Sequence, residues 1–341
     1  MNHTANWIAV DWGSSNLRAW ALDAADSVVS QTSSPHGMLG LATDEFEGVL
    51  LETVADWLPA RDEAPIPVLI CGMAGARQGW AEADYLALNE GDDILGRLGS
   101  RLTPVNTRDS RLQVRIVPGL CEQSAADTTD AAGEAFDVMR GEETQLAGLV
   151  ATQPHFSGAV CLPGTHSKWA RLNHGNIEGF TTFMSGELFN LLSQDSVLKH
   201  SVKNPLRHPV KHPVGSDDLS QSAQRAAYLA GIDTALAAPA RLSAELFGIR
   251  ARDLLDSRLP EGDARRGELS ARLSGLILGL ELAGATASLP TGSQVVLIGA
   301  EALCQRYRIA LEHLGFAVSL AANADMILAG LGRIQRAATA V

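Results

Sequence analysis

The sequence predicts an α/β protein with mainly parallel strands at its functional edges. Short apolar runs of strand length alternate along the chain with longer segments in which apolar residues recur at helical spacing. This alternation is typical of sheets whose strands are joined through helices. The expected strands are Trp7–Val10, Val68–Cys71, Val114–Val117, Ala159–Leu162 and Val295–Ile298, and the expected helices are Asp44–Trp57, Glu142–Ala151, Leu242–Asp256, Ser270–Ser288 and Ala300–Leu314.

The size and composition of the chain fit a protein with a sizeable core. It has 341 residues, 46% of them hydrophobic, and the usual domain size of about 100–200 residues gives two domains or one large one. No internal sequence repeat is visible, so any duplication is expected in the fold alone. The formal net charge is −12 and no basic tract occurs. Nucleic acid is therefore not an expected partner.

The N-terminus and the cysteines favour a cytoplasmic protein. The chain runs into the apolar segment Trp7–Val10 without the basic stretch and cleavage site of a signal peptide. No apolar run approaches the roughly 18 residues of a membrane span. The four cysteines form no CxxC or Cys/His cluster, which favours reduced core residues over disulfides or metal ligands. They are Cys71, Cys121, Cys161 and Cys304.

Three of the expected strands end in turns that contain glycine together with small or hydroxylated residues. In open α/β sheets, ligands gather at the carboxyl ends of the strands. These turns are therefore the expected ligand-binding segments. They are Asp11–Ser15, Pro163–Ser167 and Gly299–Glu301.

The first turn predicts a phosphate-binding hairpin. Apolar and polar residues alternate over Leu17–Ala21, so a second strand is expected to follow it. The N–H groups of Gly13, Ser14 and Ser15 can converge on an anion at such a turn. Asp11, at the end of the first strand, is placed to hold a hydrated Mg²⁺ beside the phosphates. Taken alone, the segment also fits an ordinary Asp-X-Gly turn.

The second and third turns extend this prediction to a nucleotide. Gly164 and Thr165 are expected to meet the terminal phosphates from the opposite side. Lys168 is expected to neutralise charge there or to bind an acidic substrate. In the third turn, an adenine ring can pack on the backbone of Gly299 and Ala300. Close packing of a helix on a strand also explains this glycine.

Six stretches, spread over almost the whole chain, carry a resemblance to a known family. They are Ile8–Trp20, Gly72–Trp80, Asp137–Leu146, Leu162–Trp169, Phe183–Phe189 and Leu273–Glu281. Through them the chain resembles the 2-dehydro-3-deoxygalactonokinases, and the order of its three turns resembles that of the actin/hexokinase/Hsp70 superfamily. The resemblance implies a two-lobed actin-like ATPase (ribonuclease H-like) fold, with lobes at residues 1–135 and 136–341 and a cleft between them.

The resemblance also implies a reaction. Such kinases transfer the γ-phosphate of ATP, with Mg²⁺, to O6 of 2-dehydro-3-deoxy-D-galactonate in galactose and galactonate catabolism, so ATP and a sugar acid are the expected small-molecule partners. Lys203–Arg241 matches the family least, and its role and the preferred C4 stereochemistry stay open. Lys203–Asp218 within it is expected to be an exposed loop. The alternatives are a kinase of another sugar acid or polyol, such as 2-dehydro-3-deoxygluconate, and a non-catalytic ATP-binding sugar sensor.

Two adjacent glutamates are the candidates for the catalytic base. In related carbohydrate kinases, a Gly-Asp pair before the second phosphate hairpin supplies the catalytic carboxylate. Glu142 follows Gly141 in the corresponding place, so Glu142 is the first candidate and Glu143 the second. Acidic residues in the first turn of a helix also interact favourably with the helix dipole, which explains the pair without catalysis.

The carboxylate of a sugar acid calls for a cation, preferably a planar guanidinium. Arg77 is the first candidate for this contact and Arg140 the second. Gln78 and Trp80 are expected to contact hydroxyl groups and to cover the sugar chain. For three further residues both a ligand contact and a structural role stay open: Arg18, His166 and Glu187.

The amphipathic helices expected at Leu242–Asp256 and Ser270–Ser288 carry apolar residues at helical spacing. Packing into the core is the preferred interpretation. Self-association through one of them, giving a homo-oligomer, is the alternative.

Overall fold

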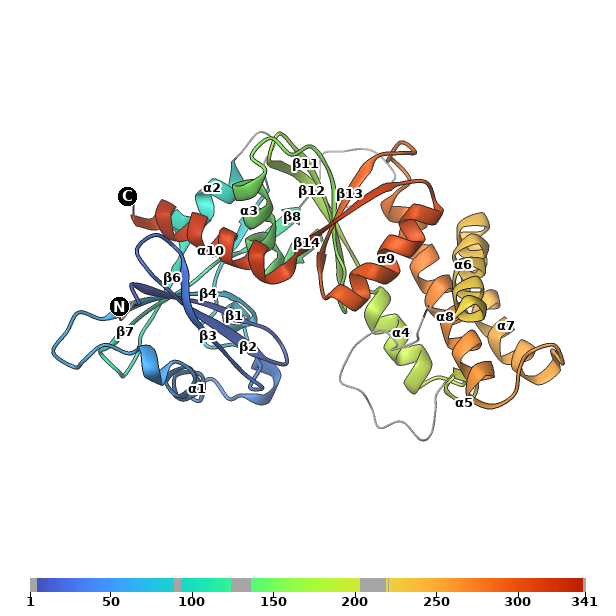
Figure 1. The fold of residues 1–341 in the computed structure, drawn as a ribbon, viewed down its shortest axis with the longest axis horizontal. Helices are drawn as coiled ribbons and strands as arrows, with labels where there is room; N and C mark the ends of the chain where they lie inside the picture. Colours follow the sequence, from blue (N-terminus) through green and yellow to red (C-terminus); the bar gives the residue numbers. More distant parts are fainter. Residues whose placement is uncertain (1–4, 89–92, 124–135, 203–218, 220, 340–341) are drawn as a thin grey trace. The chain divides into compact units, whose positions relative to one another are not determined.

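The α/β arrangement predicted from the sequence is present in the structure. The computed structural model describes residues 5–88, 93–123, 136–202, 219 and 221–339 (Figure 1). Every expected strand and helix occurs in it, and the largest difference is that the second of the two amphipathic helices begins at Gly262. The strands are β1 (Trp7–Trp12), β4 (Ile66–Gly72), β7 (Leu112–Ile116), β10 (Gly158–Leu162) and β13 (Gln294–Gly299), and the helices are α1 (Phe46–Thr53), α3 (Glu142–Thr152), α7 (Leu242–Leu255), α8 (Gly262–Ala285) and α9 (Glu301–His313).

Further elements complete the sheets and the helical layers. The additional strands are β2 (Leu17–Leu22), β3 (Val28–Ser34), β5 (Tyr85–Ala87), β6 (Thr103–Val105), β8 (Gly119–Gln123), β9 (Phe136–Met139), β11 (Ser167–Asn173), β12 (Asn176–Phe183) and β14 (Ala317–Ala322). The additional helices are α2 (Ile94–Arg97), α4 (Ser185–Gln194), α5 (Lys199–Val202), α6 (Ser222–Ala237) and α10 (Asn323–Thr339). The loop expected at Lys203–Asp218 lies outside the described residues. None of the helices in the described ranges has both the length and the apolar character of a membrane span.

The two larger sheets share one strand order. In the first, β1, β2 and β3 form an antiparallel meander, and β4 pairs parallel with β1 on the other side, giving the order β3-β2-β1-β4-β7-β6. In the second, the order is β12-β11-β10-β13-β14, with β13 parallel to β10. The duplication that the sequence does not show is therefore present in the fold. This repeated order is the topology of the actin-like (ribonuclease H-like) fold, so the predicted fold class is confirmed.

The chain divides into two compact units. The first comprises Met1–Ser157, Arg171–Phe180 and Ala321–Val341, and the second comprises Gly158–Ala170 and Thr181–Leu320. These bounds differ from the lobes expected at residues 1–135 and 136–341, because α3 and α10 pack on each other and α10 also packs on β1 and β4. The assignment of lobes with separate functions stays a prediction.

Each unit has its own apolar core. In the first unit, the core lies around β1, β2 and β4 and includes an aromatic cluster, with the Trp12 and Phe46 rings 4.9 Å apart. In the second unit, the core surrounds α8, which is buried along most of its C-terminal half against α6 and β13. The four cysteines form no disulfide, and Cys71, Cys161 and Cys304 are buried, as expected for core residues.

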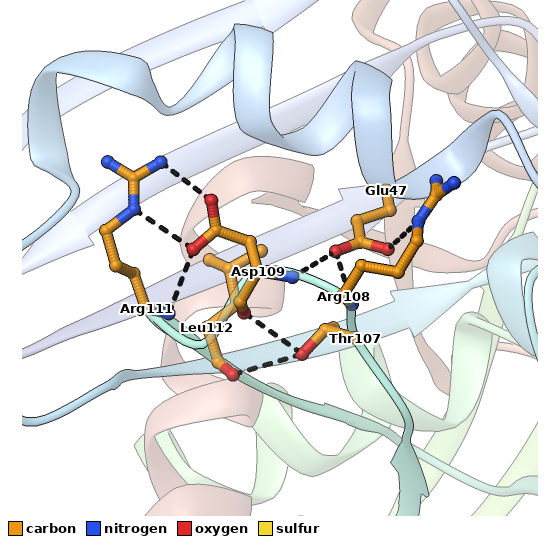
Figure 2. A network of polar contacts seen from close by, with 6 residues as sticks. All are labelled: Glu47, Thr107, Arg108, Asp109, Arg111 and Leu112. Carbon is orange, nitrogen blue, oxygen red and sulfur yellow. Dashed lines mark hydrogen bonds and ion pairs between the residues drawn. The ribbon is translucent and has the colours of Figure 1, made fainter. Parts of the chain in front are cut away.

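A network of polar contacts attaches α1 to the loop before β7 (Figure 2). The buried carboxylate of Glu47 accepts hydrogen bonds from the backbone N–H groups of Arg108 and Asp109, at 2.7 and 2.8 Å, and from Nε of Arg108 at 3.0 Å. Arg111 donates to both carboxylate oxygens of Asp109, and these hydrogen bonds hold the pKa of Asp109 well below its usual value. The network thereby fixes the helix that carries Phe46 against the sheet.

Two glycines allow α3 and α10 to cross in close contact. A Cβ atom on Gly148 would overlap the carbonyl oxygen of Met326, and one on Gly330 would overlap that of Thr144. Real Cβ contacts do not reach such distances, so any larger residue must push the helices apart. This crossing holds α3, whose first turn carries both candidate bases.

We expect Gly148→Ala to lower the free energy of unfolding by roughly 1–3 kcal/mol, the usual cost of overpacking. Denaturant-induced unfolding of the variant and the wild type measures this difference. Gly48→Ala in α1 is the matched control, because a Cβ there meets nothing within 4 Å. The control should be neutral or slightly stabilising. Equal effects of the two substitutions would contradict a close crossing at Gly148.

Candidate active site

The first predicted phosphate turn is a tight hairpin between β1 and β2. The Gly13 N–H donates to the carbonyl of Asn16 at 2.9 Å, which closes the turn. The carbonyls of Gly13 and Ser14 accept hydrogen bonds from backbone N–H groups after β3. Within the described part of the chain, the N–H groups of Ser14 and Ser15 have no acceptor. The turn therefore offers these two donors to an anion, whereas the sequence predicted three.

Asp11 lies at the end of β1 and is held by an ion pair. Its Oδ2 accepts from Arg18 Nη2 at 2.6 Å and from Nε at 3.2 Å, across the β1–β2 register that pairs the two residues. The second oxygen, Oδ1, lies 4.0 Å from the Cys71 thiol. The structure thus gives Arg18 a structural role as the partner of Asp11. One carboxylate oxygen remains for a ligand.

Two glycines bring the start of α3 to the ends of β1 and β4. Gly72 has φ of 91°, and a Cβ there would lie 2.7 Å from the Trp12 carbonyl oxygen. Gly141 has φ of 107°, and a Cβ there would lie 3.3 Å from Cα of Gly72. Glycine adopts positive φ without strain and leaves room for the neighbouring backbone. Consequently Asp11 and the two glutamates of α3 lie close together.

Glu143 is fully buried and caps its own helix. Its Oε2 accepts from the Gly141 N–H at 2.6 Å, and its Oε1 accepts from Thr144 Oγ1 at 3.0 Å. Burial, together with the nearby charge of Glu142, raises the pKa of Glu143 to about 8. Its carboxyl group is therefore mostly protonated at neutral pH and cannot accept a substrate proton there.

Glu142 is the more accessible of the two glutamates. Its side chain is half-buried, and its Oε2 accepts from the Arg140 backbone N–H at 3.1 Å. Since successive residues of a helix point about 100° apart, one glutamate faces the core while the other does not. The structure therefore favours the first of the two candidate bases.

The buried Cys71 thiol lies between the two acidic positions. Burial raises its pKa well above the usual value, and the negative charges of Asp11 and Glu143 add to this effect. The thiol therefore stays protonated and contributes no charge to the site. The sequence had placed Cys71 in the core and had not indicated its contact with Asp11.

The two candidate arginines have different surroundings. The guanidinium of Arg140 lies over the Tyr85 ring at 4.3 Å and donates to the Ala83 carbonyl at 2.7 Å. Its Nε and Nη1 are buried without a hydrogen-bond partner among the described residues. The Arg77 side chain is 80% exposed and contacts Glu82 at 3.3 Å. Only Arg77 thus presents its guanidinium to solvent.

Trp80 does not occupy the place that the sequence suggested for it. Its side chain is only 9% exposed, and its ring lies 6.1 Å from that of Trp12 and stacks on Phe46 at 6.2 Å. The indole thus belongs to the core of the first unit, because a large apolar ring gains more from burial than from a wet surface. Gln78 is exposed. The structure therefore gives no support to Trp80 as a cover for the sugar chain.

The second predicted phosphate turn lies against the start of α4. A Cβ on Gly186 would lie 2.5 Å from the Gly164 carbonyl oxygen, and the Glu187 N–H donates to the Thr165 carbonyl at 3.0 Å. His166 Nε2 is 2.6 Å from a Glu187 carboxylate oxygen. These contacts give His166 and Glu187 a structural role, because together they fix the turn to the helix.

Lys168 does not present a free ammonium group at this turn. Its side chain lies along β11, and Nζ donates to Thr182 Oγ1 at 2.7 Å. The residue is only 7% exposed.

A buried carboxylate ties the second turn to two helices. Glu281 on α8 accepts hydrogen bonds from Ser167 Oγ at 2.9 Å, Trp169 Nε1 at 2.7 Å and the Tyr307 hydroxyl at 3.0 Å. Burial raises the pKa of Glu281. Sequence reasoning missed this residue as part of the site. The sequence did offer a signal, because Glu281 ends one of the six matching stretches. Its partners Ser167 and Trp169 lie in another of these stretches, whereas Tyr307 lies outside them.

The third predicted turn adjoins the second in space, and the helix that follows it, α9, lines a pocket. A Cβ on Gly299 would lie 3.2 Å from the Pro163 carbonyl oxygen, and Ala300 is the N-cap of α9. The pocket is partly open to solvent and lies between α4, α6, α8 and α9. Apolar walls with a few polar groups are typical of small-molecule sites. Its lining residues, which the sequence did not indicate, are Ser185, Gly186, Phe189, Tyr228, Ser274, Ile277, Leu278, Leu303, Arg306 and Tyr307.

The predicted site residues thus form two groups, one in each unit. In the first unit, the structure brings together Asp11, Ser14, Ser15 and the glutamates of α3. In the second unit, it brings the turn at Gly164 and Thr165 next to Gly299 and Ala300. Duplicated actin-like sheets with glycine turns at their strand ends are typical of a class of proteins that includes ATPases and carbohydrate kinases.

Comparison with known proteins identifies the kinase family. The sequence model of the 2-keto-3-deoxy-galactonokinase family matches residues 11–334, and the chain belongs to this family. The chain is 33% identical to the 2-dehydro-3-deoxygalactonokinase of Escherichia coli (strain K12), over 98% of this chain and 99% of that protein. It is 36% identical to the "Probable 2-dehydro-3-deoxygalactonokinase DgoK1" of Rhizobium meliloti (strain 1021), over 99% of both.

A solved structure has the same fold. The crystal structure of a Sinorhizobium meliloti protein assigned as a 2-dehydro-3-deoxygalactonokinase superposes with a TM-score of 0.79 and 35% sequence identity. The alignment covers 97% of this chain and 98% of that one. The fold similarity therefore extends over both units.

The pH dependence of stability tests whether the buried carboxyl group of Glu143 is protonated in the folded protein. Its folded-state pKa of about 8 lies above the ordinary value of 4.5, so the folded protein binds more protons than the unfolded chain between these pH values. The wild type therefore loses stability as pH rises through this window. Glu143→Gln cannot titrate, and we expect its unfolding free energy to improve relative to wild type from pH 5 to pH 8. Urea unfolding at several pH values measures this trend.

The exposed Glu52→Gln serves as a control, and a pH-independent difference for Glu143→Gln would contradict a buried, protonated carboxyl group.

Proposed function

We propose that the protein transfers the γ-phosphoryl group of ATP to O6 of 2-dehydro-3-deoxy-D-galactonate, as a step of galactose and galactonate catabolism. The observation that carries this proposal is the full-length match to the kinase family. The relatives that match this chain over nearly their whole length are named for this substrate. The geometry of the first unit agrees with it, because a phosphate-binding turn and an accessible carboxylate belong to one site.

Glu142 is the proposed general base. Phosphoryl transfer needs a group that accepts the proton of the attacking hydroxyl. Glu142 is half-buried at the start of α3. The raised pKa of Glu143, caused first by burial, supports Glu142 as the base in preference to Glu143 at neutral pH.

Asp11 is the proposed partner of a Mg²⁺ ion that accompanies ATP. Mg²⁺ in kinase sites keeps several waters and uses one or two carboxylates together with substrate phosphates. Asp11 fits this requirement, because Arg18 occupies Oδ2, whereas the contact of Oδ1 among the described residues is a weak one with the Cys71 thiol at 4.0 Å. When bound, the ion would neutralise charge on the phosphates.

The backbone groups around the turns are the proposed ligands of the nucleotide. Ser14 and Ser15 offer N–H groups to phosphate, and Gly164 and Thr165 form the second phosphate turn. The adenine ring is assigned to the pocket between α4, α6, α8 and α9, which Leu303 lines one helical turn after Ala300. Glu281 stabilises this region, because its carboxylate accepts hydrogen bonds from Ser167 of β11 and from Tyr307 of α9.

The proposed anchor for the substrate carboxylate is Arg77. Its guanidinium is exposed, and among the described residues its ion pair is with the exposed Glu82, an interaction that costs little to exchange. Arg140 is assigned to positioning, because its side chain reaches the Ala83 carbonyl and lies against Gly75, at the two ends of the loop that carries Arg77. Gln78, on the same exposed segment, is proposed to contact the sugar hydroxyls.

The substrate assignment is tested by identifying products. The wild-type protein is incubated with ATP, Mg²⁺ and either 2-dehydro-3-deoxy-D-galactonate or its C4 epimer, 2-dehydro-3-deoxy-D-gluconate. We expect phosphorylation at O6, with the higher kcat/KM for the galactonate, measured by a coupled ADP assay and by NMR of the product. Preferential turnover of the epimer or of an aldose would defeat the substrate assignment. Nucleotide binding without turnover of any sugar acid would favour a sugar sensor.

Matched substitutions of the two glutamates test which of them is the general base. We expect Glu142→Gln to lower kcat by roughly 10²–10⁴-fold, the usual contribution of a general base. Glu143→Gln should retain most of the activity at neutral pH, because the wild-type side chain is already uncharged there. Both variants should bind ATP as the wild type does, as measured by calorimetry. Full activity of Glu142→Gln would show that this base assignment is wrong.

A further inference from the structure

Helix α7 exposes an apolar face that nothing in the described part of the chain covers. Phe247, Leu254 and Leu255 are 62%, 64% and 83% exposed. At about 100° per residue, these three side chains share one stripe with three small residues, and the stripe is about 120° wide. The small residues are Ala244, Gly248 and Ala251.

This face is not the one that attaches α7 to the protein. The opposite side of the helix packs into the core through the buried Ile249, with Leu242 and Leu246 partly buried beside it. The helix is therefore apolar on two sides, whereas a surface helix needs only one apolar stripe. A contiguous exposed apolar patch of this kind marks an interaction surface.

We propose that two copies of this chain associate through α7, with the helices antiparallel around a two-fold axis near Gly248 and Ile249. A two-fold interface uses the same surface on both copies, so it must be self-complementary. The antiparallel register places Phe247 opposite the partner's Ala251, and Leu254 opposite the partner's Ala244. Large side chains thus face small ones, and a Cβ on Gly248 would meet nothing within 4 Å, so there is room for the partner's side chain.

The charges beside the stripe favour a second copy in this orientation. Glu245 and Arg252 border the same edge of the face. Arg252 is exposed and has no ion pair among the described residues, and Glu245 makes only long contacts, at 3.9 and 4.0 Å, with arginines of its own chain. Antiparallel packing brings each Arg252 beside the partner's Glu245, twice per dimer. In a parallel arrangement about a two-fold axis, this edge of one helix would face the opposite edge of the partner, so Glu245 and Arg252 would not pair.

Charge reversal tests both the surface and the register. We expect the wild type to have the mass of a dimer in sedimentation equilibrium at roughly 10–100 μM, a range suited to an interface of small area. Glu245→Arg alone and Arg252→Glu alone should each weaken self-association at least tenfold, because each creates two repulsive pairs. A 1:1 mixture of these two variants should form heterodimers, since both cross-pairs become attractive. The double variant carrying both substitutions should regain the wild-type dimer.

Two further variants test whether self-association depends on the α7 face or on other exposed apolar positions. Phe247→Glu should give a monomer with unchanged kinase activity per chain, because α7 contributes no proposed site residue. Val28→Glu, which adds the same charge at an exposed apolar position of the first unit, is the control and should leave the dimer intact. A monomeric wild type would overturn the proposal, as would a dimer that survives Phe247→Glu. Failure of the two charge variants to associate with each other would overturn the antiparallel register.

Discussion

The candidate site depends on the close approach of three backbone segments in the first unit. Gly72 lies against the Trp12 carbonyl, and Gly141 lies against Gly72. Both glycines have positive φ, which other residues adopt only with strain. Without this contact, the end of β1 and the start of α3 would be separated by at least the width of a side chain. Asp11 and Glu142 would then no longer belong to one site.

In the second unit, a buried carboxylate holds separate segments of the chain together. There, Glu281 receives hydrogen bonds from Ser167, Trp169 and Tyr307, so strand β11 and helices α8 and α9 share one carboxylate. Buried carboxylates are costly unless all their partners are in place, and a complete network therefore specifies a single arrangement. The phosphate turn and the helix beside the pocket are positioned through this network rather than through loops alone.

The sequence predicted the features that depend on local pattern and missed those that depend on packing. Apolar runs and glycine turns predicted β1, β4, β10 and both hairpins, because strand length and turn chemistry are local properties. The same local view could not separate Glu142 from Glu143, since burial is decided by α10 and by Gly72. It also assigned Trp80 to the sugar, although that ring completes an aromatic cluster with residues more than thirty positions away. Glu281 was missed for the same reason.

Charge at the first turn follows from these packing choices. Asp11, Glu142 and Glu143 lie near one another, and three negative charges beside a phosphate-binding turn would repel an anionic ligand. Arg18 balances Asp11 at 2.6 Å, and burial keeps both Glu143 and Cys71 protonated. Glu142 is the half-buried carboxylate of this group, and it is the proposed proton acceptor. The burial of Glu143 therefore serves the proposed chemistry as well as the helix cap, because an ionised group there would raise the cost of bringing ATP to Ser14 and Ser15.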